Sequence, residues 1–159
     1  MELIVIAAVG CGNRVIGRDG GLPWNIPDEY QQFLEHIRGH TVIMGRISWE
    51  IFGEDLTSAR HIVLTRNPRK VRNAITVPSF EQALERAEAI GSRRTFVAGG
   101  ASVYEEALSE ADALYLSYVK GEYSGDTFFP DFDPADWSVE WTREHPAFEF
   151  VAYGRRAVA

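Results

Sequence analysis

Cysteine, lysine and long apolar runs are scarce in this sequence, and each shortage excludes a class of protein. The single cysteine, Cys11, rules out an internal disulfide, and one cysteine with four scattered histidines offers no spacing for a zinc site. No apolar run approaches the roughly 18 residues that span a membrane, and the N-terminus lacks the basic and apolar regions of a signal peptide. We therefore expect a cytoplasmic protein with no metal and no membrane partner.

Positive charge is also scarce. The formal net charge is −7 at pH 7, whereas a protein that neutralises nucleic-acid phosphates needs a basic face. Two nucleotide-binding signatures are absent as well, because the sequence contains no Gly-x-Gly-x-x-Gly fingerprint and no P-loop. We expect no nucleic-acid partner, and a Rossmann domain or a kinase is disfavoured.

The remaining composition is that of an ordinary globular protein. Hydrophobic residues make up 45% and charged residues 25% of the 159 residues. A chain of this length buries about 70% of the surface that its unfolded form exposes, which is enough for a core with a deep cleft. No repeat, linker or low-complexity tract divides the chain. We expect one domain over residues 1–159 that acts as a monomer.

Apolar segments alternate with amphipathic ones along the chain. Residues 3–9 form a continuous apolar run, typical of a central strand buried on both faces. Ser79 precedes a helical apolar face, with Gln82 placed as its capping-box partner. Further segments are predicted as strands at 40–44, 60–65, 74–77, 95–98 and 113–119, helices over 27–38, from 46 through 52 and around 103–108, a loop at 121–136, and a hairpin of 137–141 with 147–153. This order predicts an α/β fold with a mostly parallel central sheet, an antiparallel C-terminal hairpin and helices on both faces.

One carboxylate is predicted to lie on a buried helix face. Pro27 suits the first turn of a helix, and Glu29 stands on the apolar stripe that continues through Tyr30, Phe33, Leu34 and Ile37. An acid in the first turn also complements the positive end of the helix, a contribution of about 0.3–1 kcal/mol. The preceding glycine-rich segment, which carries Trp24 and can close over a ligand, favours a functional acid instead.

Three strand ends supply groups that suit a phosphate. Gly45-Arg46-Ile47-Ser48 and Gly99-Gly100-Ala101-Ser102 each follow a strand and open a helix, whose free N–H groups can hold an anion. Thr65-Arg66 follows a third strand, and a guanidinium binds two phosphate oxygens at once. Ligands of open α/β sheets bind beyond the carboxyl ends of the strands, so we expect the three segments at one edge. Each signal is weak alone, because a tight turn or a solvated arginine is the commoner interpretation.

Together these pieces resemble the dihydrofolate reductase family along nearly the whole chain. Six motifs stand in the family's order: Ile6-Ala7-Ala8, Asn13-Arg14-Val15-Ile16-Gly17, Leu22-Pro23-Trp24-Asn25-Ile26-Pro27, Val42-Ile43-Met44-Gly45-Arg46, Gly99-Gly100 with Val103-Tyr104-Glu105, and Gly125-Asp126-Thr127-Phe128-Phe129-Pro130. The resemblance implies hydride transfer from NADPH to the pterin ring of dihydrofolate, which gives tetrahydrofolate.

By position, the resemblance implies a substrate site around Glu29. This residue is similar to the acid that pairs with the 2-amino group and a ring nitrogen of the pterin and helps to recruit a proton through water. Trp24 and Ser117 correspond to residues that hold such a water and steady the acid. Leu22 and Tyr104 correspond to residues beside the nicotinamide. The other substrate positions are Ile6, Ala7, Phe33, Phe52 and Ala98.

The resemblance also implies an NADPH site. Its positions are Ala8, Ile16, Gly20, Gly45, Arg46, Ile47, Ser48, Leu64, Thr65, Arg66, Gly99, Gly100, Ala101, Ser102, Val103, Tyr104 and Thr127. Arg46, Thr65 and Arg66 match the cluster around the 2′-phosphate, which implies a preference for NADPH over NADH. Gly99-Gly100 is the position of a cis peptide bond in the family.

Two positions depart from the family's pattern. One is Ala98, where the family often has a larger aliphatic residue, and the other is Ala59. An arginine just before the third apolar strand binds the α-carboxylate of the folate's glutamate tail in the family, and Ala59 stands there in this chain. Arg60 is one residue away and points the other way in an extended segment. Losing a charge-assisted pair costs about 1.5–3 kcal/mol, so we expect a raised Michaelis constant for folates.

Two other functions are to be weighed against reduction of dihydrofolate. The reductase of riboflavin synthesis shares the fold and the use of NADPH but lacks the Trp-x-x-Pro-x-acid arrangement that Trp24, Pro27 and Glu29 provide. A non-catalytic pterin- or nucleotide-binding protein would have lost the acid or the arginines, and both are present. Catalysis is therefore the favoured interpretation.

Overall fold

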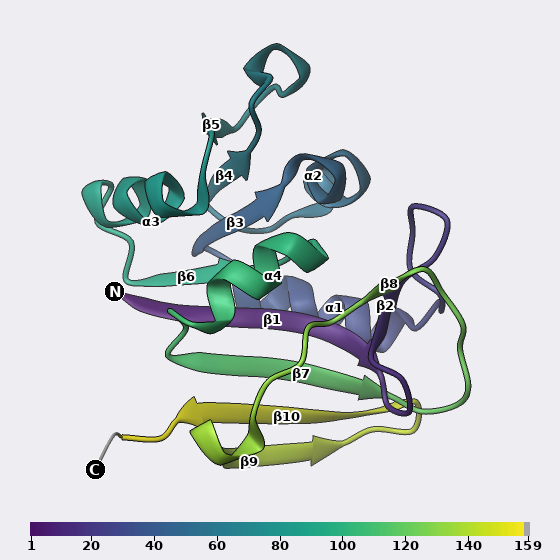
Figure 1. The fold of residues 1–159 in the computed structure, drawn as a ribbon. Helices are drawn as coiled ribbons and strands as arrows, with labels where there is room; N and C mark the ends of the chain where they lie inside the picture. The colour runs from purple at the N-terminus through teal and green to yellow at the C-terminus, as the bar shows by residue number, and fades with distance from the viewer. Residues whose placement is uncertain (158–159) are drawn as a thin grey trace.

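The computed structural model describes residues 1–157, and its main feature is an eight-stranded sheet (Figure 1). The strands that run parallel to one another are β1 (Glu2–Gly10), β3 (Thr41–Gly45), β4 (Arg60–Leu64), β5 (Ile75–Val77), β6 (Arg94–Val97) and β7 (Ala113–Val119). β10 (Phe148–Arg155) pairs antiparallel with both β7 and β9 (Trp137–Glu144). The strand order β5-β4-β3-β6-β1-β7-β10-β9 confirms a mostly parallel sheet with an antiparallel C-terminal hairpin.

The first strand, β1, is buried on both faces, as its continuous apolar run predicts. Its alternate residues contribute to two different cores: Leu3, Val5, Ala7 and Val9 to one, Ile4 and Ile6 to the other. Side chains alternate between the faces of a strand, so the register of β1 determines which of its residues face each core.

Helices cover the two faces in pairs. α3 (Phe80–Ala89) and α4 (Ala101–Leu108) pack on the core that contains Leu3. α1 (Pro27–Ile37) and α2 (Arg46–Phe52) pack on the opposite core. In Figure 1, α4 lies in front of β1 and α1 lies behind it. The prediction of helices on both faces is confirmed. Within residues 1–157, no helix is long and apolar enough to cross a membrane.

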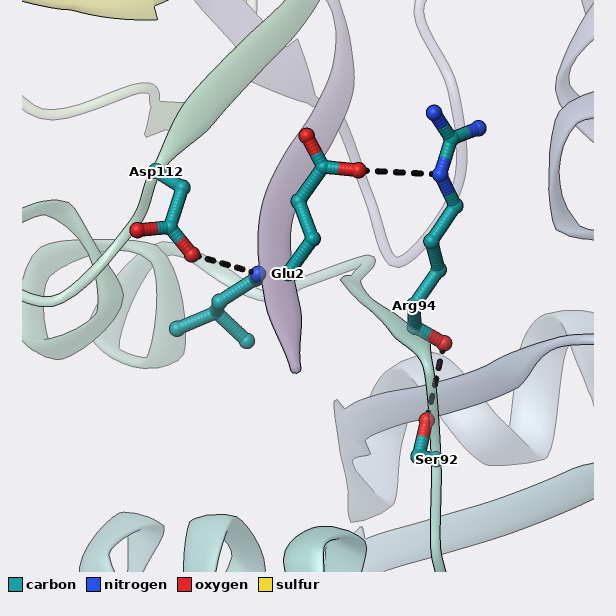
Figure 2. Close-up of polar contacts among 5 residues, drawn as sticks. Glu2, Ser92, Arg94 and Asp112 are labelled. Carbon is teal, nitrogen blue, oxygen red and sulfur yellow. Dashed lines mark hydrogen bonds and ion pairs between the residues drawn. The ribbon is translucent and has the colours of Figure 1, made fainter.

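The N-terminal ends of the central strands are joined by polar contacts (Figure 2). Arg94 Nε donates to Glu2 Oε1 at 2.9 Å, so β6 is linked to β1. Asp112, which directly precedes β7, accepts a hydrogen bond from the Leu3 N–H at 2.8 Å. Ser92 Oγ donates to the Arg94 carbonyl at 2.9 Å. Ligands are expected at the carboxyl ends of the strands, and these contacts lie at the opposite edge of the sheet.

The segment predicted as a loop over 121–136 contains two short elements. β8 (Thr127–Phe128) pairs antiparallel with β2 (Val15–Gly17), and η3 (Pro134–Asp136) forms a turn of 3₁₀ helix. Strands of two and three residues carry no detectable alternation, so the prediction of a continuous loop was wrong there. The pairing brings Thr127 against the glycine-rich segment that follows β1.

Several boundaries also differ from the prediction. β9 continues to Glu144 and β10 to Arg155, beyond the predicted 141 and 153. The added residues of β9 are polar and exposed, so they do not contribute to an apolar pattern. Two further 3₁₀ turns, η1 (Gly53–Asp55) and η2 (Pro68–Lys70), follow α2 and β4.

The predicted N-cap of α3 is present. Ser79 Oγ accepts a hydrogen bond from the Gln82 N–H at 3.2 Å and so satisfies one of the free donors of the first turn.

Replacing this cap is expected to destabilise the protein measurably. Ser79→Ala should lower the free energy of unfolding by about 0.5–2 kcal/mol, because the Gln82 N–H loses its acceptor. Ser79→Asp keeps an acceptor at the same place and serves as the matched control. Urea unfolding followed by circular dichroism measures both variants. Equal stability of Ser79→Ala and the parent would contradict a role for this cap.

Candidate active site

The central feature of the site is a buried carboxylate. Glu29, in the first turn of α1, is only 8% exposed, as the apolar stripe predicts. Ser117 Oγ donates a hydrogen bond to Glu29 Oε2 at 3.0 Å. Gln32 Nε2 donates in turn to Ser117 Oγ at 3.3 Å. Ser117 lies on β7 opposite Ala8 of β1, so the sheet and the helix together determine the surroundings of the acid.

Burial changes the acidity of this group. Removal from water raises the pKa of Glu29 from 4.5 to about 7, and the hydrogen bond from Ser117 lowers it only partly. Near neutral pH the side chain is therefore divided between its charged and neutral forms. A group with such a pKa can both accept and release a proton at physiological pH, as a general acid or base requires.

A small cavity of about 70 Å³ lies beside Glu29. Its lining consists of Ile6, Ala7, Ala8, Leu22, Glu29, Tyr30, Phe33, Phe52, Ala98 and Tyr104. All the substrate positions that the resemblance implies, except Ser117, are in this set. Tyr30 was predicted only as part of the apolar stripe, and its place in the lining was missed. The stripe identified the right face of α1, but no sequence signal separates core from cavity wall.

Tyr104 closes one side of this cavity from α4. Its buried hydroxyl donates to the Ile6 carbonyl at 2.8 Å, and its ring lies 5.0 Å from that of Phe129. Burial, with a smaller contribution from the charge of Glu29, raises the pKa of the phenol, so it stays a neutral donor. A carbonyl oxygen has two lone pairs, so Ile6 can still accept a second hydrogen bond.

A larger cavity of about 700 Å³ adjoins the first. This volume lies within the range of cofactor and ligand sites in proteins, about 300–1,000 Å³. The lining residues common to both cavities are Ala8, Leu22, Phe52, Ala98 and Tyr104. A ligand in one cavity would therefore meet a ligand in the other at these residues.

The larger cavity contains most of the predicted cofactor positions. These are Ala8, Ile16, Gly20, Gly45, Arg46, Ile47, Ser48, Leu64, Gly99, Gly100, Ala101, Ser102, Val103, Tyr104 and Thr127. Sequence reasoning did not assign Gly17, Arg18, Gly21, Ile51 and Glu106, which also line it. Three of these five, Gly17, Gly21 and Ile51, are directly next to a predicted position in the chain, and Arg18 and Glu106 are two residues from one. The prediction therefore found the right segments and missed some of their residues.

The wall of this cavity suits a negatively charged group. Gly45 and Gly100 are the N-caps of α2 and α4, and no side chain caps either helix. Their first-turn N–H groups thus remain available to an anion beside Arg46 and Ser48. The Gly99–Gly100 peptide bond is cis, as the resemblance implies. Gly99 has φ +119°, and a Cβ there would lie 2.9 Å from Ser48 Oγ, so only glycine fits.

Four predicted residues lie outside both linings. Thr65 and Arg66 directly follow Leu64, which does line the larger cavity; Thr65 Oγ1 accepts from the Asn67 N–H at 2.9 Å, and Arg66 is exposed. Ser117 contacts Glu29 from behind the cavity wall. Trp24 is 7% exposed, and its buried Nε1–H has no hydrogen-bond acceptor among residues 1–157. This N–H remains free to donate to a ligand or a water.

The raised pKa of Glu29 is expected to make stability depend on pH. The folded state holds the proton of the Glu29 carboxyl more tightly than the unfolded state does. The stability that this proton contributes is therefore complete below pH 4.5 and is lost as pH rises through about 7. Glu29→Gln stays neutral and should therefore be more stable than the parent by about 2–3 kcal/mol at about pH 8, with little difference at about pH 4.

Urea unfolding at both pH values measures this difference. Asp28→Asn, which removes an exposed acid from the same helical turn, is the matched control and should show no such pH dependence. A constant difference between Glu29→Gln and the parent across this range would contradict a raised pKa.

Comparison with known proteins gives a consistent result. The family model described as Dihydrofolate reductase matches residues 2–155. Dihydrofolate reductase HdrB of Haloferax volcanii is 37% identical over 168 residues, which cover 100% of this chain and 86% of that protein. Dihydrofolate reductase type 3 of Salmonella typhimurium is 35% identical and covers 95% of this chain and 93% of that protein.

A solved structure agrees with the sequence relatives. The dihydrofolate reductase from Enterococcus faecalis, complexed with NADP(H) and RAB-propyl, is similar to this chain with a TM-score of 0.87 at 30% identity. The match covers 98% of this chain and 97% of that one. The buried acid, the two adjoining cavities and these matches lead to one conclusion: the chain belongs to the dihydrofolate reductase family.

Proposed function

We propose that Glu29 anchors the pterin ring of 7,8-dihydrofolate and assists its protonation while NADPH reduces it to 5,6,7,8-tetrahydrofolate. The protein is an NADPH-dependent dihydrofolate reductase by family. The role of Glu29 is supported by one observation above all: a buried carboxylate with a pKa of about 7 lies in the wall of a cavity that adjoins a second, larger one.

The small cavity has the groups that a pterin ring needs. The Glu29 carboxylate would accept hydrogen bonds from the 2-amino group and a ring nitrogen. The carbonyls of Ile6 and Ala98 would accept from the amino group, and Ala7 lines the same cavity. Phe33 and Phe52 line the same cavity and would pack on the ring and the aminobenzoyl group.

Reduction also requires a proton at the imine nitrogen as the hydride arrives. Glu29 would polarise the ring and bring this proton through a water molecule. Ser117 holds the carboxylate by its hydrogen bond and is itself held by the hydrogen bond from Gln32. The buried Trp24 Nε1–H would orient the water. Leu22, on the glycine-rich segment, lines both cavities and would exclude bulk water from the place where they meet.

The larger cavity is proposed as the cofactor site. NADPH, when bound, supplies the hydride. Ala8, Ile16, Gly20, Tyr104 and Thr127 would surround the nicotinamide end, and the first turns of α2 and α4 would hold the phosphates. Thr65 and Arg66, beside the cavity, would bind the 2′-phosphate together with Arg46.

Three broader expectations complete the proposal. A cytoplasmic location, a monomeric state and the lack of nucleic-acid or membrane partners stay predictions of the sequence, as does a single domain over residues 1–159. Size-exclusion chromatography tests the monomer directly.

Removing the acid should separate its chemical role from substrate binding. Glu29→Gln is expected to lower kcat with dihydrofolate about 10²–10⁴-fold at neutral pH, because a proton donor is lost. Activity should partly return at low pH, where the substrate arrives already protonated. Loss of absorbance at the NADPH band measures turnover. Unchanged kcat at neutral pH would rule out the proposed role of Glu29.

The choice between NADPH and NADH should depend on Arg66. Arg66→Ala is expected to lower kcat/KM for NADPH about tenfold through loss of a charge-assisted hydrogen bond to phosphate, with little effect on NADH. Arg69→Ala, in the exposed turn that follows, is the matched control. An equal change for both cofactors in Arg66→Ala would argue against a 2′-phosphate contact.

A further inference from the structure

Glu29 is the end of a short chain of polar side chains that leads away from the cavity. Ser117 Oγ donates to Glu29 Oε2 at 3.0 Å, and Gln32 Nε2 donates to Ser117 Oγ at 3.3 Å. Gln32 follows Glu29 by three residues on α1, so the two side chains are neighbours on one side of the helix. Ser117, which is 2% exposed on β7, contacts both of them.

The direction of the Ser117 hydroxyl determines what Glu29 experiences. A hydroxyl has one proton and two lone pairs, so it donates one hydrogen bond and accepts up to two. If this proton turned toward Gln32, the carboxylate would face a lone pair, which favours the neutral acid. Gln32 instead donates an N–H to the hydroxyl oxygen, so the hydroxyl proton is left for Glu29. Hydrogen bonds in such a chain also polarise and strengthen one another.

The other titratable groups that face Glu29 across the cavity are phenols. Among the residues that line the small cavity, Glu29 is the one charged side chain. Tyr104 reaches the cavity from α4 and donates to the Ile6 carbonyl, and Tyr30 of α1 donates to Asp55 Oδ2 at 2.8 Å. Burial raises the pKa of both phenols, so they are neutral near pH 7. The remaining lining residues, from β1, the glycine-rich segment, α1, α2 and the end of β6, are apolar: Ile6, Ala7, Ala8, Leu22, Phe33, Phe52 and Ala98.

Behind the cavity wall, α1 carries one further titratable group on the same side. His36 follows Glu29 by seven residues, and its ring stacks on that of Phe150 at 5.2 Å. Burial lowers the pKa of this imidazole, so it is neutral near pH 7. Within residues 1–157, burial and the hydrogen bond from Ser117 are therefore the two influences that determine the pKa of Glu29.

We propose that Gln32 is a positioning residue for Glu29: its amide holds the Ser117 hydroxyl with the proton directed at the carboxylate and so stabilises the charged form of the acid. The inference deepens the proposed function and rests on it, because it concerns how the same acid is tuned. Without the amide the hydroxyl can turn, and the carboxylate loses part of its hydrogen bond. The pKa of Glu29 should then rise above its present value of about 7.

The first test measures this pKa in the free protein. Gln32→Leu keeps a side chain of similar size without the amide and should raise the pKa of Glu29 by about 0.5, because each bond in the chain contributes only part of its strength to the next. Titration of the glutamate carboxyl carbons by ¹³C NMR measures the pKa, and the signal that is lost in Glu29→Gln assigns the resonance. Gln31→Leu makes the same chemical change at the exposed neighbouring residue and should leave the pKa unchanged.

Gln32→Glu tests the direction of the hydrogen bond. A carboxylate at this position has no N–H, accepts the proton of the Ser117 hydroxyl and adds a like charge near Glu29. The pKa of Glu29 should therefore rise by more than about 1, well beyond the effect of Gln32→Leu. An unchanged pKa in either variant would refute the inference.

The effect of Gln32 must also pass through the Ser117 hydroxyl. Ser117→Ala should raise the pKa of Glu29 by about 1, because the hydrogen bond to the charged form is lost. Adding Gln32→Leu to Ser117→Ala should change the pKa no further, because the two residues act as a unit. An equal rise from Gln32→Leu in both backgrounds would mean that Gln32 acts by packing alone, and the inference would fail.

The pH profile of kcat/KM for dihydrofolate separates this inference from the proposed function. If Glu29 brings the proton, activity falls as pH rises through its pKa, and this descending limb should move up in Gln32→Leu by the same amount as the pKa measured by NMR. A raised pKa with an unmoved profile would support the placement of Ser117 by Gln32 and remove the proposed role of Glu29. An unmoved pKa with a descending limb near pH 7 would leave the proposed function standing and refute the inference alone.

Discussion

The burial of the Glu29 carboxylate is the constraint on which the site depends. A charged carboxylate away from water is costly, and here one hydrogen bond from Ser117 offsets only part of that cost, which leaves the pKa near 7. Ser117 reaches Glu29 because β7 pairs with β1 in the register that places it opposite Ala8. A slip of one residue in β7 would turn Ser117 to the other face of the sheet.

The parallel order of the strands explains why the two cavities meet. Ala8 lies near the carboxyl end of β1, and Ala98 directly follows the carboxyl end of β6. Phe52 comes from α2, which begins directly after β3. Tyr104 comes from α4, which begins shortly after β6. Because parallel strands all end at one edge, segments distant in the sequence converge there, and a reacting pair of ligands can share a wall.

Sequence reasoning succeeded where a local pattern or a motif carries the information. The continuous run over 3–9 predicted a strand buried on both faces, and the stripe after Pro27 placed Glu29 correctly. The family motifs located nearly every lining residue. The contacts Gln32–Ser117 and Tyr30–Asp55 were not predicted, because each joins polar atoms distant in the sequence, and no periodicity encodes such pairs.

The acids around this site differ in how strongly solvent weakens their charges. Glu29 is buried, so solvent screens its charge little and burial raises its pKa to about 7. Asp55 and Glu54 are exposed, so water and salt screen their charges. A substitution that removes the charge of Glu29 should therefore change the electrostatics of the cavity far more than one that removes the charge of Asp55 or Glu54.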